Sequence, residues 1–490
     1  MLWLITFAVL VCMILWKFLK TENNDLDRVP GPPKWPIIGS ALMFLGLPPS
    51  QMFDLVVELP KKYGNRVVIT MLNRYILNIY DVEDIEIVLS HSRNIKKNKP
   101  YDFLEPWLGT GLIVSTGSKW HRRRKILTPT FHFDILKSFM KVFEEKTKNL
   151  VVDLRRGISE GSGVVDVMPF ISDFTLYTIC ETAMGIRLDS DKSEATVKYK
   201  QAIMDIGELV MKRLTTIWLR NDFIFSLHPT GKKFAKCLES VHSFADNVII
   251  ERKKSYEKDG EISSSTSKRR LALLDLLLEA ERKGEIDLEG IREEVNNFMF
   301  AGHDTTATAL TFGLMLLADH EDVQERILEE CTSILGDSDR SPNMSELGEM
   351  KYLEAVIKEI LRLYPSGPFI GRKITEDFML GDIKIKKGCE VVVHIYEMQR
   401  REDLYPEPEV FRPERFLDGE SRHPYAYVPF SAGLRNCIGQ RFAKLEMKMA
   451  ICEIIRNFRL GPMKKGARPA LKADLVLRPN ESIFVKFVER

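Results

Sequence analysis

The residues of this chain that could do chemistry include Cys437, which lies in the glycine-rich stretch FSAGLRNCIG at 430–439. The sequence after Gly439 changes to a helical pattern, so the cysteine is expected just before a helix N-terminus. The unpaired amides and the positive dipole end there favour a thiolate over a thiol. Glycines let a flat ligand approach the backbone closely, and Arg435 could pair with an anionic group on it. These parts would suit a thiolate bound to the iron of a haem; the alternative is a buried structural cysteine.

A second stretch of this kind is AGHDTT at 301–306. It lies within a helical pattern that runs from Asp287, the predicted N-terminal cap, to about His320. Glycine and consecutive threonines are poor helix formers, at roughly 0.5–1 kcal/mol each, so the stretch is either a tolerated irregularity or a functional groove. In a groove, Asp304 would be an acid and Thr305 a hydroxyl that pass protons through water to dioxygen, because cleavage of the O–O bond needs protons.

The rest of the chain must position these groups. At 490 residues it can bury a large core as one domain or two. Its net charge of +2 gives no indication of nucleic acid as a partner. Its seven cysteines are scattered and odd in number, which argues against a disulfide framework and for a reducing compartment. No G-x-G-x-x-G motif follows a strand, so electrons for redox chemistry would come from a partner protein.

The first 19 residues are apolar apart from Thr6 and Lys17. A cleaved signal peptide would need a basic start and a small-x-small cleavage site, which this segment lacks, and the length suffices for a tilted transmembrane helix. Lysines on its C-terminal side would place the following chain in the cytosol. We therefore expect a membrane anchor at 1–20, a polar spacer and proline-rich hinge at 21–40, and a catalytic domain at 41–490.

The remaining pattern predicts a mainly α protein with a small β-sheet region. Alternating residues at 66–80 predict two strands around a turn. Later strands are expected to form hairpins that turn near 381–382 and near 387–388. A last hairpin is expected to turn near 479–480. Most of the other segments are helical.

Two pairs of side chains share helix faces. Trp120 and Arg124 are four residues apart in KWHRRRK, and Glu359 and Arg362 are three apart in KEILR. Taken alone, the first pair is read most simply as part of an amphipathic helix with a solvated basic side. The second is read most simply as an exposed ion pair of little energetic value.

Five motifs occur in the order that is found in the cytochrome P-450 superfamily, the haem-thiolate monooxygenases. The chain resembles this superfamily over about residues 30–488. The motifs are W-x-x-x-R at 120–124, AGxDTT at 301–306, E-x-x-R at 359–362, PFIGR followed by PERF, and F-x-x-G-x-R-x-C-x-G at 430–439. The segment LTPTFHFDILKSF at 127–139 is similar to the family-four, fatty-acid-hydroxylase branch, and the chain resembles its insect-type microsomal members.

The resemblance implies haem b as the cofactor, with Cys437 as the axial ligand of its iron. Many family-four members carry a glutamate at the position of Ala301, where it forms an ester with a haem methyl group. Alanine cannot form this ester, so we expect haem to be held by the bond from Cys437 to iron and by non-covalent contacts. The implied cofactor-binding residues are Cys437, Trp120, Arg124, Arg372, Arg435, Phe430, Gly433 and Gly439.

The resemblance also assigns roles to other residues. Asp304 and Thr305 would be the catalytic proton relay. Gln399 stands where the family usually has histidine. A buried structural cluster behind the cysteine loop would consist of Glu359, Arg362 and Arg415. Substrate contacts are expected from the 100–115 and 205–225 regions and from Ala301, Thr305, Pro368, Phe369 and Ile370.

The implied function is insertion of one oxygen atom of dioxygen into an apolar substrate: a fatty acid, a related lipid or a foreign compound. Electrons would come from NADPH through NADPH–cytochrome P-450 reductase, with cytochrome b5 as an optional second donor. A basic surface that includes Arg122, Arg123 and Lys125 would dock the acidic donor. The expected location is the endoplasmic reticulum membrane, with a single-pass anchor and a cytosolic catalytic domain, and no nucleic-acid partner is expected.

Two other functions stay open. A haem-thiolate isomerase or dehydratase would rearrange lipid hydroperoxides without a reductase, but it would have no need of Asp304 and Thr305. A non-catalytic haem or lipid carrier would leave the electron-entry and proton-delivery groups without a use. NADPH consumption that depends on added lipid would separate the carrier from the enzyme.

Overall fold

The computed structural model describes residues 3, 6, 13 and 24–490, with the exception of 36–37, 72–73, 162, 189–192, 263–271, 420–421 and 473. The predicted anchor at 1–20 therefore lies almost wholly outside the described residues. Among the residues that are described, no helix is both long enough and apolar enough to cross a membrane.

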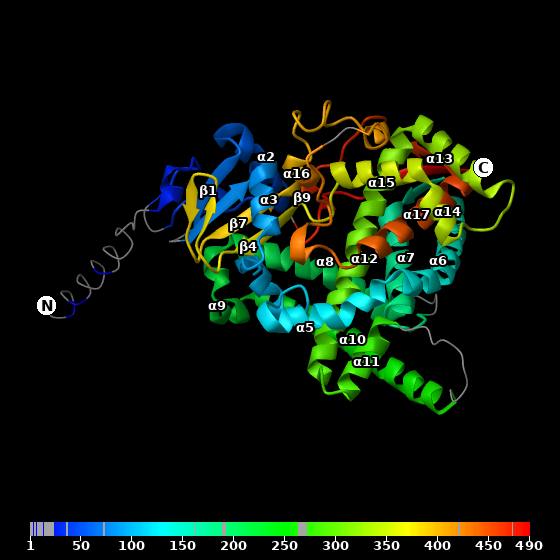
Figure 1. The fold of residues 1–490 in the computed structure, drawn as a ribbon, viewed down its shortest axis with the longest axis horizontal. Helices are drawn as coiled ribbons and strands as arrows, with labels where there is room; N and C mark the ends of the chain where they lie inside the picture. Colours follow the sequence, from blue (N-terminus) through cyan, green and yellow to red (C-terminus); the bar gives the residue numbers. More distant parts are fainter. Residues whose placement is uncertain are drawn as a thin grey trace.

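Helices make up most of the fold, and Figure 1 shows most of them to one side of the main sheet. The first half of the chain contributes α2 (Pro49–Tyr63), α3 (Val82–Ser90), α4 (Glu105–Leu108), α5 (Gly117–Leu127), α6 (Phe133–Glu160), α7 (Val167–Thr182), α8 (Glu194–Thr215) and α9 (Asp222–Leu227). The second half contributes α10 (Pro229–Ile262), α11 (Leu273–Arg282), α12 (Leu288–Asp319), α13 (Glu321–Leu335), α14 (Met344–Glu349), α15 (Lys351–Leu363), α16 (Ile395–Met398) and α17 (Gln440–Asn457).

The strands of the described residues form four small sheets, so the prediction of a mainly α fold with a small β region is confirmed. The largest sheet has the order β1 (Arg66–Met71), β2 (Arg74–Ile79), β7 (Glu390–His394) and β4 (Phe369–Lys373), with only the β2–β7 pair parallel. A second sheet has the order β3 (Val164–Asp166), β11 (Phe484–Glu489) and β8 (Phe458–Pro462). The other two are the pairs β5 (Phe378–Leu380) with β6 (Ile383–Ile385) and β9 (Leu471–Lys472) with β10 (Arg478–Pro479).

Two of the expected hairpins are absent from the described strands. The turn near 387–388 does not join a hairpin, because β7 is buried along most of its length and pairs with β2 and β4 instead of β6. The turn near 479–480 is not a hairpin either. The N–H of Asn480 donates to the carbonyl of Ala470 at 2.7 Å, and β10 pairs in antiparallel fashion with the preceding strand β9, not with β11. The hairpin therefore turns earlier, between 472 and 478.

The long helix α12 passes through the helical part of the molecule (Figure 1) and packs against α7, α10, α15 and α17. Asp287 caps it as predicted, since its carboxylate accepts the N–H of Gly290 at 2.8 Å. The helix ends before His320, also as predicted. Because α12 is buried along most of its length, the side chains of 301–306 are held in the interior.

The described part of the predicted spacer and hinge lies against the main sheet. The N–H of Val68 in β1 donates to the carbonyl of Pro30 at 2.9 Å. A Cβ on Gly31 would lie 2.0 Å from the carbonyl oxygen of Val68, so only glycine allows this close contact. Leu26 is fully buried. The segment is thus packed onto the sheet from Asn24 onward.

Candidate active site

The loop that carries Cys437 is a closed turn before α17. The N–H of Cys437 donates to the carbonyl of Phe430 at 2.9 Å. Gly433 has a φ of 66°, and a Cβ there would lie 2.0 Å from the carbonyl oxygen of Leu89 at the end of α3. Only glycine fits such a position. Gly433 therefore shapes the turn that presents Cys437.

Two cavities, of about 160 and 270 Å3, lie between this loop and α12. Cys437, Arg435 and Ala301 line both of them, so together they form a slot between the loop and the middle of the helix. Of the other predicted cofactor-binding residues, Trp120, Arg124, Phe430 and Gly439 also line the slot. Gly433 does not.

The side chain of Cys437 is open to the slot but is otherwise enclosed by protein. Burial raises the pKa of its thiol, while the N–H of Gly439 and the charge of Arg124 oppose the rise. The helix N-terminus alone therefore does not keep Cys437 deprotonated, as the sequence had suggested. A metal cation bound to the sulfur would stabilise the thiolate.

Three cationic side chains line one end of the slot, namely Lys97, Arg124 and Arg435. Arg372 does not line the slot, but it lies close enough to repel Lys97 and Arg435. Burial, with repulsion from Arg372, lowers the pKa of Arg435 to about 9. Burial also lowers the pKa of Lys97, and repulsion from Arg372 and Arg435 adds to the effect. Among the described residues, Nη2 of Arg372 and Nε of Arg435 are buried without a hydrogen-bond partner. Unpaired buried cations are costly, so this end of the slot fits the carboxylates of haem propionates.

Lys97 is a member of this group that the sequence did not reveal, because the segment around it matches no motif. Trp120 and Arg124 lie where the sequence predicted, on the inner face of α5. The guanidinium of Arg435 lies over the Trp120 ring, 5.0 Å from its centre. Arg124 donates to both the carbonyl and the side-chain oxygen of Asn436, at 2.9 and 2.8 Å. These contacts join α5 to the cysteine loop.

The expectation that Arg123 belongs to a basic surface is wrong. Its side chain is buried and pairs with Glu293 and Glu294 of α12, at 3.2 and 3.5 Å. The reason is the helical period, which turns residue 123 toward the core together with Trp120 and Leu127. Arg122 and Lys125 are exposed as expected.

The structure separates the predicted acid–alcohol pair on α12. Thr305 lines the slot and donates its hydroxyl to the carbonyl of Ala301 at 2.7 Å. Asp304 lines none of the cavities around the slot. Its two carboxylate oxygens instead accept from Nη2 of Arg478 at 2.8 and 2.7 Å. No sequence pattern indicated Arg478 as the partner of Asp304, because it lies 174 residues away in β10.

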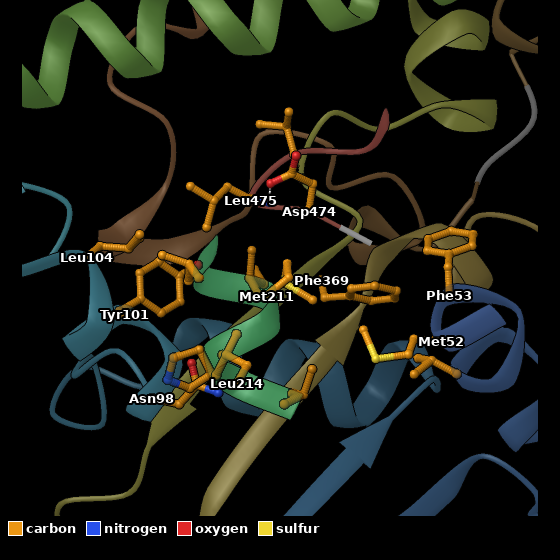
Figure 2. Close-up of a pocket in the computed structure, with 18 of the residues that line it drawn as sticks. Met52, Phe53, Asn98, Tyr101, Leu104, Met211, Leu214, Phe369, Asp474 and Leu475 are labelled. Carbon is orange, nitrogen blue, oxygen red and sulfur yellow. Dashed lines mark hydrogen bonds between the residues drawn. The ribbon is translucent and has the colours of Figure 1, made fainter. Parts of the chain in front are cut away.

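A larger cavity of about 440 Å3 adjoins the slot, because Ala301 and Thr305 line both. Figure 2 shows part of the lining of this larger cavity. Its lining is mostly apolar, which fits an apolar ligand. The expected regions contribute Tyr101, Leu104, Met211 and Leu214, and β2 and β7 also contribute. Of the individual residues that were predicted, Ala301, Thr305, Phe369 and Ile370 line this cavity. Pro368 does not, and its carbonyl instead accepts the N–H groups of Ile395 and Tyr396.

Glu359, Arg362 and Arg415 meet in the core beside α15. Arg362 donates to the two oxygens of Glu359 at 2.7 and 2.8 Å, and Nε of Arg415 donates at 2.9 Å. All three side chains are almost completely buried. The alternative that Glu359 and Arg362 form an exposed ion pair is therefore excluded.

Comparison with known proteins agrees with this geometry. The family model described as Cytochrome P450 matches residues 29–487. Cytochrome P450 4d2 of Drosophila melanogaster is 41% identical over 488 residues, which cover 97% of this chain and 96% of the relative. Cytochrome P450 4c3 of the same organism is 38% identical, with 99% and 93% covered. Cytochrome P450 4V2 of Homo sapiens is 37% identical, with 93% and 88% covered.

A cysteine loop facing a long helix across a slot, with cations at one end, is the architecture of a haem-thiolate enzyme. The chain belongs to the cytochrome P450 family and resembles family-four members over nearly its whole length. It is a cytochrome P450 monooxygenase, whose cofactor is haem with a cysteine thiolate ligand.

Proposed function

We propose that this monooxygenase hydroxylates an apolar lipid, with fatty acids first and apolar foreign compounds second, using electrons from NADPH through a separate reductase. In this reaction the substrate, dioxygen, NADPH and a proton give the alcohol, water and oxidised NADP. The observation that carries the proposal is the shared wall at Ala301 and Thr305. The apolar cavity meets the slot there, so a substrate in the cavity would lie next to the cofactor.

The residues of the chain would have separate roles in haem binding and in proton delivery. Bound haem supplies the iron at which dioxygen is activated. Cys437 would be its ligand, while Trp120 and the four cations Lys97, Arg124, Arg372 and Arg435 would hold its propionate side. Thr305 would hold a water or a proton at its hydroxyl in the slot, and Asp304 would supply protons to it. Ala301 has no carboxylate, so attachment of haem would be non-covalent apart from the iron–sulfur bond.

Membrane attachment at the endoplasmic reticulum is part of the proposal. An apolar surface next to the main sheet supports it: Trp218, Phe223 and Leu227 are 53%, 72% and 61% exposed. Ile217, beside them, packs with Met43 against the buried cluster that contains Ala41, so this surface continues toward the N-terminal segment. Such exposed apolar side chains suit a lipid interface. The anchor at 1–20 would add to this contact.

NADPH–cytochrome P-450 reductase is the proposed electron donor, and cytochrome b5 a second one. Arg122 and Lys125 remain exposed on α5, the helix that contacts the cysteine loop through Arg124. They would attract an acidic donor to the face nearest the cofactor. The electron path would then be short.

The test uses the membrane-reconstituted protein with reductase, NADPH, isotopically labelled dioxygen, and a panel of fatty acids, terpenoids and apolar drugs. A product with one labelled oxygen supports the proposal and names the substrate class. Label-free rearrangement of lipid hydroperoxides without NADPH use would favour the isomerase instead. NADPH consumption that ignores every added lipid, with no product from any, would contradict the proposal.

A further inference from the structure

The carboxylate of Asp304 is already engaged in the protein. Both of its oxygens accept from Arg478, and the two side chains are 2% and 3% exposed. Charge-assisted hydrogen bonds in such a buried site are strong. An acid that is to pass protons toward Thr305 must first loosen this contact, because it lines none of the cavities around the slot in its present position.

Arg478 is shared between two carboxylates. Its Nε donates to Asp474 at 3.2 Å, while its Nη1 is buried without a hydrogen-bond partner among the described residues. Burial raises the pKa of Asp474, and the charge of Arg478 opposes the rise. One guanidinium thus contacts two acids, and the side chains of Arg478 and Asp474 are 3% and 2% exposed. A small displacement can move it from one acid to the other.

The second acid belongs to the wall of the substrate cavity. Asp474, Leu475 and Val476 all line that cavity, and Figure 2 shows Asp474 and Leu475 on the turn that precedes β10. Asp474 also lies directly against α8: a Cβ added to Gly207 would be 1.9 Å from its carboxylate oxygen. Since Met211 and Leu214 of α8 line the same cavity, a ligand between α8 and this turn would move Asp474.

A second connection runs from the same turn to the relay hydroxyl residue. The N–H of Leu477 donates to the carbonyl of Ser366 at 2.9 Å. The Ser366 hydroxyl in turn donates to the carbonyl of Thr305 at 2.7 Å. The turn is therefore joined to both members of the relay, to Asp304 through Arg478 and to Thr305 through Ser366.

We propose that Arg478 is a positioning residue that makes proton delivery depend on substrate. With the cavity empty, Arg478 holds Asp304 away from the slot. A substrate that packs on Leu475 and Val476 moves the turn, transfers Arg478 toward Asp474 and frees Asp304 to serve Thr305. This inference rests on the proposed function, because it assumes that Asp304 supplies the protons.

The test compares Arg478→Gln, Arg478→Lys and Asp474→Asn with wild type. Binding of dodecanoic acid and dodecan-1-ol to the haem-loaded protein is measured by calorimetry, which requires no turnover. Binding and the Arg478 transfer are linked reciprocally. Arg478→Gln removes the contact that binding must break, and we expect it to tighten binding about five-fold. Asp474→Asn removes the acid that receives Arg478, and we expect it to weaken binding by about the same factor.

A second readout is the share of NADPH recovered as product rather than as hydrogen peroxide. Asp474→Asn should lower this share several-fold, because Arg478 then stays on Asp304. Arg478→Gln should keep it, and Arg478→Lys should lie near wild type since it keeps the cation. Arg252→Gln is the matched control, because Arg252 makes a similar bidentate contact with Asp275, at 2.8 Å to each oxygen, between α10 and α11.

The two neighbouring changes must act in opposite directions. The inference is overturned if Arg478→Gln and Asp474→Asn shift the binding constant the same way, or if both behave like Arg252→Gln. Failure of the proposed function looks different: wild type would then give no labelled product from any lipid. The calorimetric comparison would still decide whether Arg478 couples the cavity to Asp304.

Discussion

Gln399 binds Val428 through its side chain, with the amide oxygen of Gln399 accepting the N–H of Val428 at 3.1 Å. The amide nitrogen donates to the carbonyls of Leu361 and Arg362 at 3.1 and 3.0 Å. Gln399 is fully buried. It thus fastens the end of α15 to the segment that leads into the cysteine loop. A neutral histidine has one donor and one acceptor, so glutamine satisfies one more backbone group here than the residue usual in the family.

Gln399→Ala should lower the free energy of unfolding by about 3 kcal/mol, because three buried backbone groups lose their partner. It should also speed the loss of haem, since the cysteine loop loses a support. Gln324→Ala is the control: Gln324 is equally buried and makes three similar bonds to Leu317 and Leu460, far from that loop. Denaturant unfolding and haem transfer to apomyoglobin measure the two effects. Equal haem loss in both variants would refute the supporting role.

Cys437→Ala should abolish the characteristic thiolate absorption of the ferrous carbonyl complex, because no other described cysteine lines the slot. The protein should still fold, since the loop is closed by backbone contacts such as the one from Cys437 N–H to Phe430. Cys389→Ala, in a buried cysteine before β7, is the control and should keep the spectrum. A thiolate spectrum in the Cys437 variant would mean that a different residue binds the iron.

Thr305→Ala should leave haem binding intact but lower the product formed per NADPH by about ten-fold or more, with hydrogen peroxide in its place. The reason is that Thr305 is the hydroxyl on α12 that lines both the slot and the substrate cavity. Thr311→Ala removes a hydroxyl from the same helix that contacts Met168 instead. Both substitutions should change the stability of the helix by similarly small amounts. A difference in peroxide yield between the two variants would therefore reflect the relay. An unchanged yield in Thr305→Ala would remove Thr305 from the relay.

Lys97→Met and Arg372→Gln should each weaken haem retention about ten-fold, because a buried charge pair with a propionate is worth a kcal/mol or more. The same changes should stabilise the haem-free protein, since burial lowers the pKa of both cations there, and repulsion from Arg372 and Arg435 lowers that of Lys97 further. Lys99→Gln is the control, because Lys99 pairs with Asp102 outside the slot. Thermal unfolding measures both effects: the melting temperature should rise for the haem-free variants, and the gain in melting temperature on adding haem should shrink. Destabilisation of both forms would show that these cations are structural.

Local patterns carried most of what the sequence predicted correctly. Asp287 caps α12 because a short-range rule determines such caps, and Trp120 and Arg124 share a face because four residues complete a helical turn. The contacts that depend on distant segments could not be read this way. Arg478 lies in β10, which pairs with β9 far from α12 in the sequence, and Lys97 lies near Arg372 where the N–H of Lys373 donates to the carbonyl of Lys96 at 2.8 Å.

The burial of charged side chains was a second feature that the sequence could not predict. Charge alone placed Arg123 on a surface, yet the two carboxylates of Glu293 and Glu294 make its burial possible. Similarly, Pro368 follows the substrate-contact pattern in the sequence but uses its carbonyl to begin α16. In both cases the deciding partner lies on another element, and no periodicity in the residue's own segment reports it.

The lowered pKa of His303 should make the free energy of unfolding depend on pH. It is buried in α12 beside Ser172, with 2.9 Å between Nε2 and the serine hydroxyl, and burial lowers its pKa to about 4. The unfolded chain, with a histidine pKa near 6.5, takes up a proton at a higher pH than the folded protein. Stability is therefore full above about pH 6.5 and falls as the pH drops toward 4, by roughly 2 kcal/mol at pH 5. Denaturant unfolding between pH 7 and pH 5 measures this slope. His303→Gln keeps a polar side chain without the titration and should show a shallower decline, whereas an identical slope in the two proteins would mean that other groups cause it.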